Sequence, residues 1–76
     1  MKLDAENIDR AVLALLYLGL HDDWRAWKGF DWDALNRFHE KGLISDPVGK
    51  AKSVAFTEVG RDEARRLLIE LFGVGE

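Results

Sequence analysis

The chain has 76 residues, no cysteine and a formal net charge of −3. This length fits one domain over residues 1–76, and without cysteine neither disulfides nor thiolate metal sites can stabilise it, as is usual in the cytoplasm. The charged first residues argue against a signal peptide. The longest apolar run, Ala11–Leu20, is shorter than the roughly 20 residues that a membrane span needs.

Charge is unevenly distributed along the chain. Both ends are acidic, whereas residues 24–56 carry more basic than acidic side chains. The basic ones are Arg25, Lys28, Arg37, Lys41, Lys50 and Lys52, and the acidic ones are Asp31, Asp33, Glu40 and Asp46. Nucleic-acid binders usually carry a basic surplus, so the net charge argues against that class while the middle segment keeps it open.

The first predicted helix begins after Asp4 or Asn7, since either side chain can cap its N-terminus, and it ends at Leu18 or Leu20. Apolar residues recur along it at helical spacing. This stripe consists of Ile8, Val12, Leu15, Leu16 and Gly19. Further apolar side chains occupy the remaining sides, so we expect this helix to be covered all round.

Residues 22–28 predict a second, short helix of one or two turns. Asp22 can cap its N-terminus, and Gly29 stands where a left-handed residue commonly ends a helix. The connection over residues 29–31 is only three residues long. Joined to the next helix in this way, the short helix would form a helix-turn-helix.

The third predicted helix covers Trp32–Lys41 and is capped by Asp31. Gly42 is expected to end it in the left-handed conformation. In that case Leu43 meets Phe38, which is the apolar contact of a Schellman motif.

Two short strands are predicted after this helix. Residues 43–45 and 53–56 form the arms of a β-hairpin, and the loop over residues 46–52 contains a proline and a glycine that can turn the chain. Pro47 cannot donate a backbone hydrogen bond, so it belongs in the turn or at an edge.

The last predicted helix runs from its cap, Thr57, to about Phe72, and residues 73–76 form a frayed tail. Its apolar side chains cover more than the stripe that one core contact needs. They are Leu67, Leu68, Ile69 and Leu71, then Phe72 and Val74. Because the first helix is apolar on every side as well, we expect a homodimer that covers both surfaces.

Residues 31–72 resemble small bacterial winged-helix transcription regulators. Residues 35–44 match the end of a recognition helix that enters the first wing strand, and residues 56–60 match the second wing strand as it meets the next helix. The resemblance implies a winged-helix-like fold, mainly α with a two-stranded β-hairpin, in the order helix, short helix, helix, hairpin, helix. The chain departs from regulators in its very short second helix and in Asp33 and Glu40 on the recognition helix.

Residues 25–52 also resemble a family of small bacterial proteins that is catalogued only as a domain of unknown function. That resemblance implies no chemistry, so candidate sites depend on the residues alone.

The winged-helix plan gives candidate nucleic-acid contacts. Asn36, Arg37 and Lys41 would project from the recognition helix, and Lys50 and Lys52 from the tip of the wing. Arg37 and Asn36 would contact base edges, and the lysines would contact phosphates. The competing interpretation is that these side chains are ordinary solvated surface.

Four aromatic residues gather within nine positions: Trp24, Trp27, Phe30 and Trp32. We expect these rings to fill the core beside a short helix, with one ring partly exposed. Two alternatives are a stacking platform for single-stranded bases and an anchor for a protein partner.

No motif for catalysis or metal binding is present. The metal-ligand types His21, Asp22, Asp23, His39 and Glu40 follow no recognised zinc spacing. Ser45, Ser53 and Thr57 fall at strand or cap positions, and no histidine adjoins them as a base. We therefore expect no enzyme activity, cofactor, metal or small-molecule substrate.

Two functions remain. The first is a dimeric DNA-binding factor associated with transcription. The second is a protein-interaction or dimerisation module that does not bind DNA, which the acidic balance and the short second helix allow. The sequence favours the two almost equally, with a slight preference for the DNA-binding factor because nothing in the sequence replaces it with a sharper function.

Overall fold

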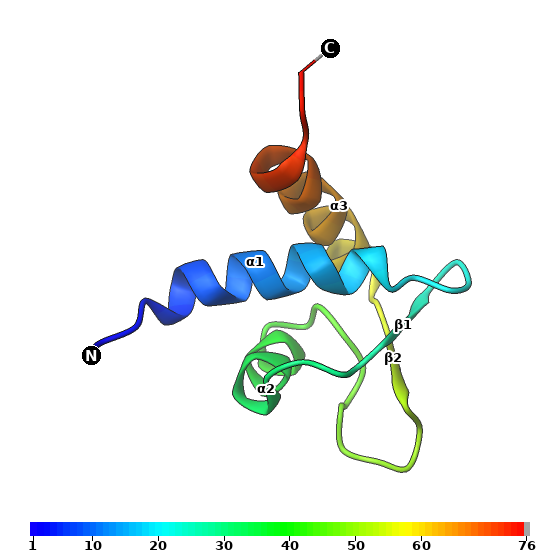
Figure 1. The fold of residues 1–76 in the computed structure, drawn as a ribbon. Helices are drawn as coiled ribbons and strands as arrows, with labels where there is room; N and C mark the ends of the chain where they lie inside the picture. Colours follow the sequence, from blue (N-terminus) through cyan, green and yellow to red (C-terminus); the bar gives the residue numbers. More distant parts are fainter. Residues whose placement is uncertain (76) are drawn as a thin grey trace.

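Three helices and a two-stranded antiparallel sheet make up the computed structural model, which describes residues 1–75 (Figure 1). The elements in chain order are α1 (Ala5–Leu18), β1 (Arg25–Trp27), α2 (Trp32–Glu40), β2 (Ser53–Ala55) and α3 (Glu58–Phe72). The mainly α class with an antiparallel β pair is thus confirmed. None of the helices within residues 1–75 is long and apolar enough to cross a membrane.

The three long helices begin where their caps predict. Side-chain oxygens of Asp4, Asp31 and Thr57 accept hydrogen bonds from N–H groups in the first turns of α1, α2 and α3, at 3.0–3.3 Å. These bonds satisfy donors that would otherwise lack a partner at a helix start. Because such caps depend on residues within a few positions, the helix boundaries follow closely from the sequence.

The end of α2 is the predicted Schellman motif. Gly42 has a φ of 74°, the left-handed conformation that glycine adopts without strain. Its N–H donates to the carbonyl of His39 at 3.0 Å, and the N–H of Leu43 donates to the carbonyl of Phe38 at 2.9 Å. The chain therefore leaves α2 in a fixed direction and enters the next extended segment at once.

The short helix predicted over residues 22–28 is wrong, because this segment forms a turn followed by β1. Asp22 does accept backbone hydrogen bonds, from the N–H groups of Trp24 and Arg25, but they close a turn. Gly29 does not adopt a positive φ. A helix of at most two turns gains little from its own hydrogen bonds, and pairing with β2 satisfies the same backbone groups while burying Ala26.

The two arms of the predicted hairpin are antiparallel neighbours. Ile44 and Phe56 form an isolated bridge, and the N–H of Ser45 donates to the carbonyl of Ala55 at 2.8 Å. On its other side β2 pairs with β1, so that Val54 lies opposite Ala26. The sheet itself is therefore β1 with β2, the segment around Ile44 is joined to it through the Ile44–Phe56 bridge and the Ser45–Ala55 contact, and β1 is the partner that the sequence did not reveal.

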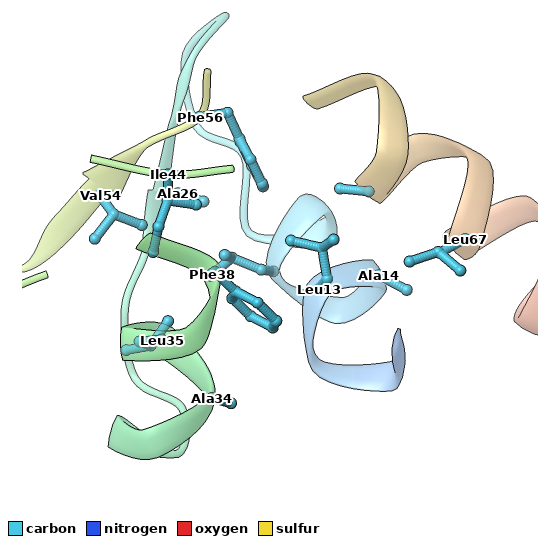
Figure 2. Close-up of a cluster of buried hydrophobic side chains, with 12 residues drawn as sticks. Leu13, Ala14, Ala26, Ala34, Leu35, Phe38, Ile44, Val54, Phe56 and Leu67 are labelled. Carbon is cyan, nitrogen blue, oxygen red and sulfur yellow. The ribbon is translucent and has the colours of Figure 1, made fainter. Parts of the chain in front are cut away.

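The core lies where α1, α2, α3 and the inner face of this sheet meet (Figure 2). Phe38 points from α2 toward α1, between the two helices. The other large buried side chains are Leu13, Leu16, Leu35, Ile44, Val54, Phe56 and Leu67. Ala14 and Ala64 are fully buried on α1 and α3, where small side chains let the two helices approach closely.

Candidate functional site

Arg37, the predicted base reader, is held in an ion pair with Asp9 of α1. Its Nε and Nη2 atoms each lie 2.6 Å from a carboxylate oxygen, a bidentate arrangement. The Asp9 side chain is only 8% exposed, whereas that of Arg37 is 34% exposed. Donation of hydrogen bonds to the Asp9 carboxylate raises the pKa of Arg37, so this guanidinium stays charged and directed toward α1.

The remaining predicted contacts lie on two separate elements. Asn36 is half-buried on α2, and Lys41 is exposed at the end of the same helix. Lys50 and Lys52 are exposed in the loop that precedes β2. No lysine takes part in an ion pair within residues 1–75, so these three ammonium groups remain open to an anion.

Lys28 orders the loop that carries Lys50 and Lys52. Its Nζ donates to the carbonyl oxygens of Pro47 at 2.7 Å and Gly49 at 3.1 Å. Its backbone N–H also donates to the carbonyl of Lys52 at 3.0 Å. This basic side chain therefore has a structural role, and sequence analysis missed it because its partners are backbone groups about twenty residues away.

The expectation that the aromatic residues fill the core is wrong for the three tryptophans. Trp24, Trp27 and Trp32 are exposed, and only Phe30 packs against the core as a partly buried ring. The space beneath the sheet is filled instead by aliphatic residues together with Phe38 and Phe56. Because β1 replaces the predicted helix, Trp27 alternates with the buried Ala26 and points to the outer face of the sheet.

Each exposed tryptophan has a charged or titratable neighbour. The guanidinium of Arg61 lies 4.3 Å from the ring centroid of Trp24. The Lys28 ammonium lies 5.9 Å from the centroid of Trp32. The imidazole of His21 is stacked on Trp27, with 4.2 Å between ring centroids. Exposed aromatic rings beside cations are typical of recognition surfaces for proteins and for nucleic acids.

A second exposed surface is apolar and belongs to α1 and α3. On α1, Leu15 and Leu18 are exposed on the side opposite the buried Leu13 and Leu16. The last turns of α3, orange to red in Figure 1, project to one side of α1, to which Glu70 is joined by an ion pair with Arg10 at 3.0 Å. Their exposed apolar side chains are Ile69, Leu71 and Phe72.

A groove between α1, the end of α2 and α3 brings charged groups around an apolar floor. Lys41 lies at its rim, and Leu13, Phe38 and Leu67 contribute to the floor. Arg66, on the opposite rim, pairs with Glu63 and Glu70, and the pairing with Glu63 raises its pKa. Most of the rim charges thus neutralise one another.

Metal-ligating side chains do not gather in the described part of the chain. Within residues 1–75 no three His, Asp or Glu side chains are close enough together to hold an ion. His21 instead stacks on Trp27, and Asp22 accepts backbone hydrogen bonds.

Comparison with known proteins places this arrangement in a family. Residues 4–74 match the model of a family described as a domain of unknown function (DUF6429). The chain belongs to this family. A relative is the uncharacterized protein y4hR of Sinorhizobium fredii, which is 51% identical over 72 residues, or 95% of this chain and 97% of that protein. No solved structure matches at a significant level. The resemblance of residues 25–52 to a domain of unknown function is thus confirmed.

Proposed function

We propose that this domain is a non-enzymatic, self-associating interaction module that works in the cytoplasm as a homodimer. The observation that carries the proposal is the position of Leu71. It extends the stripe of Gly60, Ala64 and Leu67 that α3 buries toward the core, yet this residue is 38% exposed. Apolar side chains that continue this stripe beyond the end of the core are left exposed, so another surface is needed to cover them.

The exposed apolar groups beside this stripe support the same proposal. Phe72 follows Leu71 at the end of α3 and is 50% exposed. On α1, Leu15 and Leu18 lie one turn apart on a face that the rest of the chain leaves open. A domain of this length buries only about 60% of its unfolded surface, so covering these groups in a two-fold interface would stabilise it.

Substitutions at the projecting end of α3 and on α1 test this proposal. Phe72→Glu and Leu18→Glu each place a charge within the proposed interface, and we expect dimer dissociation to become at least about tenfold easier. Sedimentation equilibrium over a micromolar range measures it. The control is Val59→Glu, since Val59 is exposed on α3 but lines the groove on the other flank.

Several outcomes would contradict the homodimer. A chain that is monomeric across the whole range refutes it directly. If Val59→Glu weakens dimerisation as much as Phe72→Glu and Leu18→Glu do, the interface lies at the groove instead. Unchanged association in both interface variants removes α1 and the end of α3 from the contact.

The non-enzymatic role is supported by the hydroxyl groups predicted at strand and cap positions. Ser45 Oγ accepts from the N–H of Ala55 at 2.9 Å, and Thr57 Oγ1 donates to the carbonyl of Gly42 at 2.7 Å. Ser53 Oγ accepts from Arg25 Nε at 2.8 Å. Each hydroxyl thus holds the sheet or a helix start, which is a structural use.

A second candidate is a winged-helix-like DNA-binding factor associated with transcription. It is favoured by one observation: Lys41, Lys50 and Lys52 are exposed and free of ion pairs within residues 1–75. The succession of α2, the antiparallel arms and α3 also follows the winged-helix order. Two observations argue against DNA binding. Arg37 is held in an ion pair with Asp9, and a strand replaces the helix that was predicted before α2.

A further inference from the structure

The outer face of the small sheet is a flat surface built from side chains of alternating positions. Ala26 and Val54 are buried on the inner face, so their neighbours along each strand point the other way. Arg25 and Trp27 of β1 therefore share the outer face with Ser53 and with Ala55 of β2. Because the residues on β2 are small, Trp27 and Arg25 are the dominant groups there.

Trp27 presents a ring that is fixed on one side and open on the other. His21 covers one ring face, with an interplanar angle of 28°. Nevertheless 55% of the Trp27 residue is exposed. Since His21 covers one face, the exposed part of the ring comprises its edge and its other face. Gly19 lies at the edge of the Trp27 ring, since a β-carbon on Gly19 would be 3.9 Å from Trp27 Cδ1, an ordinary van der Waals contact.

Positive charge lies beside this ring. The guanidinium of Arg25 is anchored flat on the sheet, with Nε 2.8 Å from Ser53 Oγ and Nη2 3.0 Å from the Ser53 carbonyl oxygen. It forms no ion pair within residues 1–75. Lys52 is exposed in the loop just before β2, and in the strand alternation it has the parity of the inner-face Val54, so it adds positive charge at the end of the sheet where Trp27 lies and not on the outer face itself. The acid in the nearby turn, Asp22, accepts two backbone N–H groups.

We propose that this outer sheet face binds single-stranded nucleic acid, with one base stacked on Trp27 and the backbone phosphates near Arg25 and Lys52. Every nucleobase has a planar face that stacks on an aromatic ring, and adjacent cations neutralise the phosphates. A base within a duplex cannot offer that face, so the site selects single strands. This inference rests on different residues from the proposed dimer interface and does not require it.

The test compares two exposed tryptophans of the same chain. Trp27→Ala should weaken binding of a labelled single-stranded oligonucleotide of roughly 12 nucleotides, DNA or RNA, by about fivefold or more in fluorescence anisotropy at low salt. Trp27→Phe should restore part of the affinity because it keeps an aromatic face. The matched control is Trp24→Ala, because Trp24 has the same strand parity as the buried Ala26 and its ring lies against Arg61.

A second readout distinguishes stacking from a general loss of structure. In a Trp24→Phe, Trp32→Phe double variant, Trp27 is the remaining tryptophan, and its emission should be quenched as the oligonucleotide binds. Lys52→Ala should lower affinity for all sequences alike and make the salt dependence shallower. Circular dichroism of each variant shows that the fold is retained.

Three results would overturn the proposal. One is no binding of DNA or RNA single strands at tens of micromolar protein. Another is equal or tighter binding of the matching duplex. The third is a loss of affinity in Trp24→Ala that equals the loss in Trp27→Ala. If an acidic peptide binds at Trp27 while oligonucleotides do not, the face recognises protein and the assignment to nucleic acid is wrong.

Discussion

The carbonyl oxygen of Leu43 lies only 1.7 Å from the point where a β-carbon on Gly60 would sit. The carbonyl carbon and Cα of Leu43 follow at 2.6 and 2.8 Å, so the obstacle is backbone. The same carbonyl oxygen accepts the N–H of Thr57 at 3.0 Å. The first turn of α3 is thus docked against the chain that leaves α2, and only glycine permits so close an approach.

We predict that Gly60→Ala destabilises the fold although alanine favours helices. Relief of the clash requires α3 to move off Leu43, which should lower the free energy of unfolding by about 1–3 kcal/mol. Urea unfolding followed by circular dichroism measures it. Gly29→Ala is the control, since Gly29 has open space around it and no positive φ. Stabilisation by Gly60→Ala would mean that the contact is looser than described.

The left-handed residue at the end of α2 gives a second prediction. Gly42 has a φ of 74° with open space around its Cα, so conformation alone opposes a side chain there. Gly42→Ala should lower the free energy of unfolding by about 1–2 kcal/mol, and Gly42→Asn should cost less because asparagine tolerates this region better. Equal costs for the two variants in urea unfolding would argue against a conformational cause.

A third prediction concerns the unequal burial of Asp9 and Arg37. Removing Arg37 leaves a carboxylate that is 8% exposed without its partner, whereas removing Asp9 leaves a guanidinium that can turn toward solvent. Arg37→Ala should therefore destabilise more than Asp9→Ala, by about 2–3 kcal/mol against about 1–2 kcal/mol. The double variant, measured in the same urea titrations at neutral pH, gives the coupling. Additive single effects would show that the pair contributes nothing as a pair.

Features that depend on near neighbours could be predicted from the sequence. The cap at Asp31 and the left-handed Gly42 act within four residues of their partners, so local spacing was sufficient. The partner of Arg37 was not predictable in this way, because the acids at helical spacing from it are Asp33 and Glu40 of its own helix. The actual partner, Asp9, lies on another helix and is brought there by packing.

Short segments were harder to assign for the same reason. Residues 22–28 contain a good cap and are followed by a glycine at helical distance, and both are equally compatible with a turn. This segment forms the strand β1 and not a helix because Ala26 pairs with Val54, which lies 28 residues further along the chain. Once the segment is a strand, Trp27 must point to the outer face. The wrong assignment of this segment as a helix therefore also led to the wrong expectation that its aromatic side chain fills the core.

The turn before β1 gives a pH-dependent prediction. Hydrogen bonds from the N–H groups of Trp24 and Arg25 lower the pKa of Asp22 below its ordinary value. This stabilisation is present above the unfolded-state pKa of about 3.9 and is lost as the pH falls through the lower folded-state pKa. Asp22→Asn should therefore be less stable than the original chain at neutral pH, with the difference shrinking below about pH 4.

Denaturation at a series of pH values checks this effect of Asp22. Asp23→Asn is the neighbouring control, since no backbone N–H within residues 1–75 is bonded to the Asp23 carboxylate. A difference between Asp22→Asn and the original chain that stays constant down to acid pH would exclude the carboxylate as its source.

The final prediction tests duplex DNA as a ligand of α2 and the loop. If DNA binds there, Lys41→Ala, Lys50→Ala and Lys52→Ala should each lower affinity for all sequences alike and reduce the slope of log affinity against log salt by about one. Lys2→Ala is the control, because Lys2 is an exposed lysine that precedes α1. Anisotropy titrations of mixed genomic duplexes over a salt series measure both quantities.

Base contacts in that complex would have to come without Arg37. The pair with Asp9 holds the guanidinium against α1, so Arg37→Ala should act through stability and leave sequence discrimination unchanged. Asn36→Ala should instead cost about 1–3 kcal/mol on a preferred site only. Loss of discrimination in Arg37→Ala at unchanged stability would show that the arginine leaves Asp9 for a base. Absence of duplex binding at tens of micromolar protein, even at low salt, would eliminate the DNA-binding function while leaving the proposed homodimer unaffected.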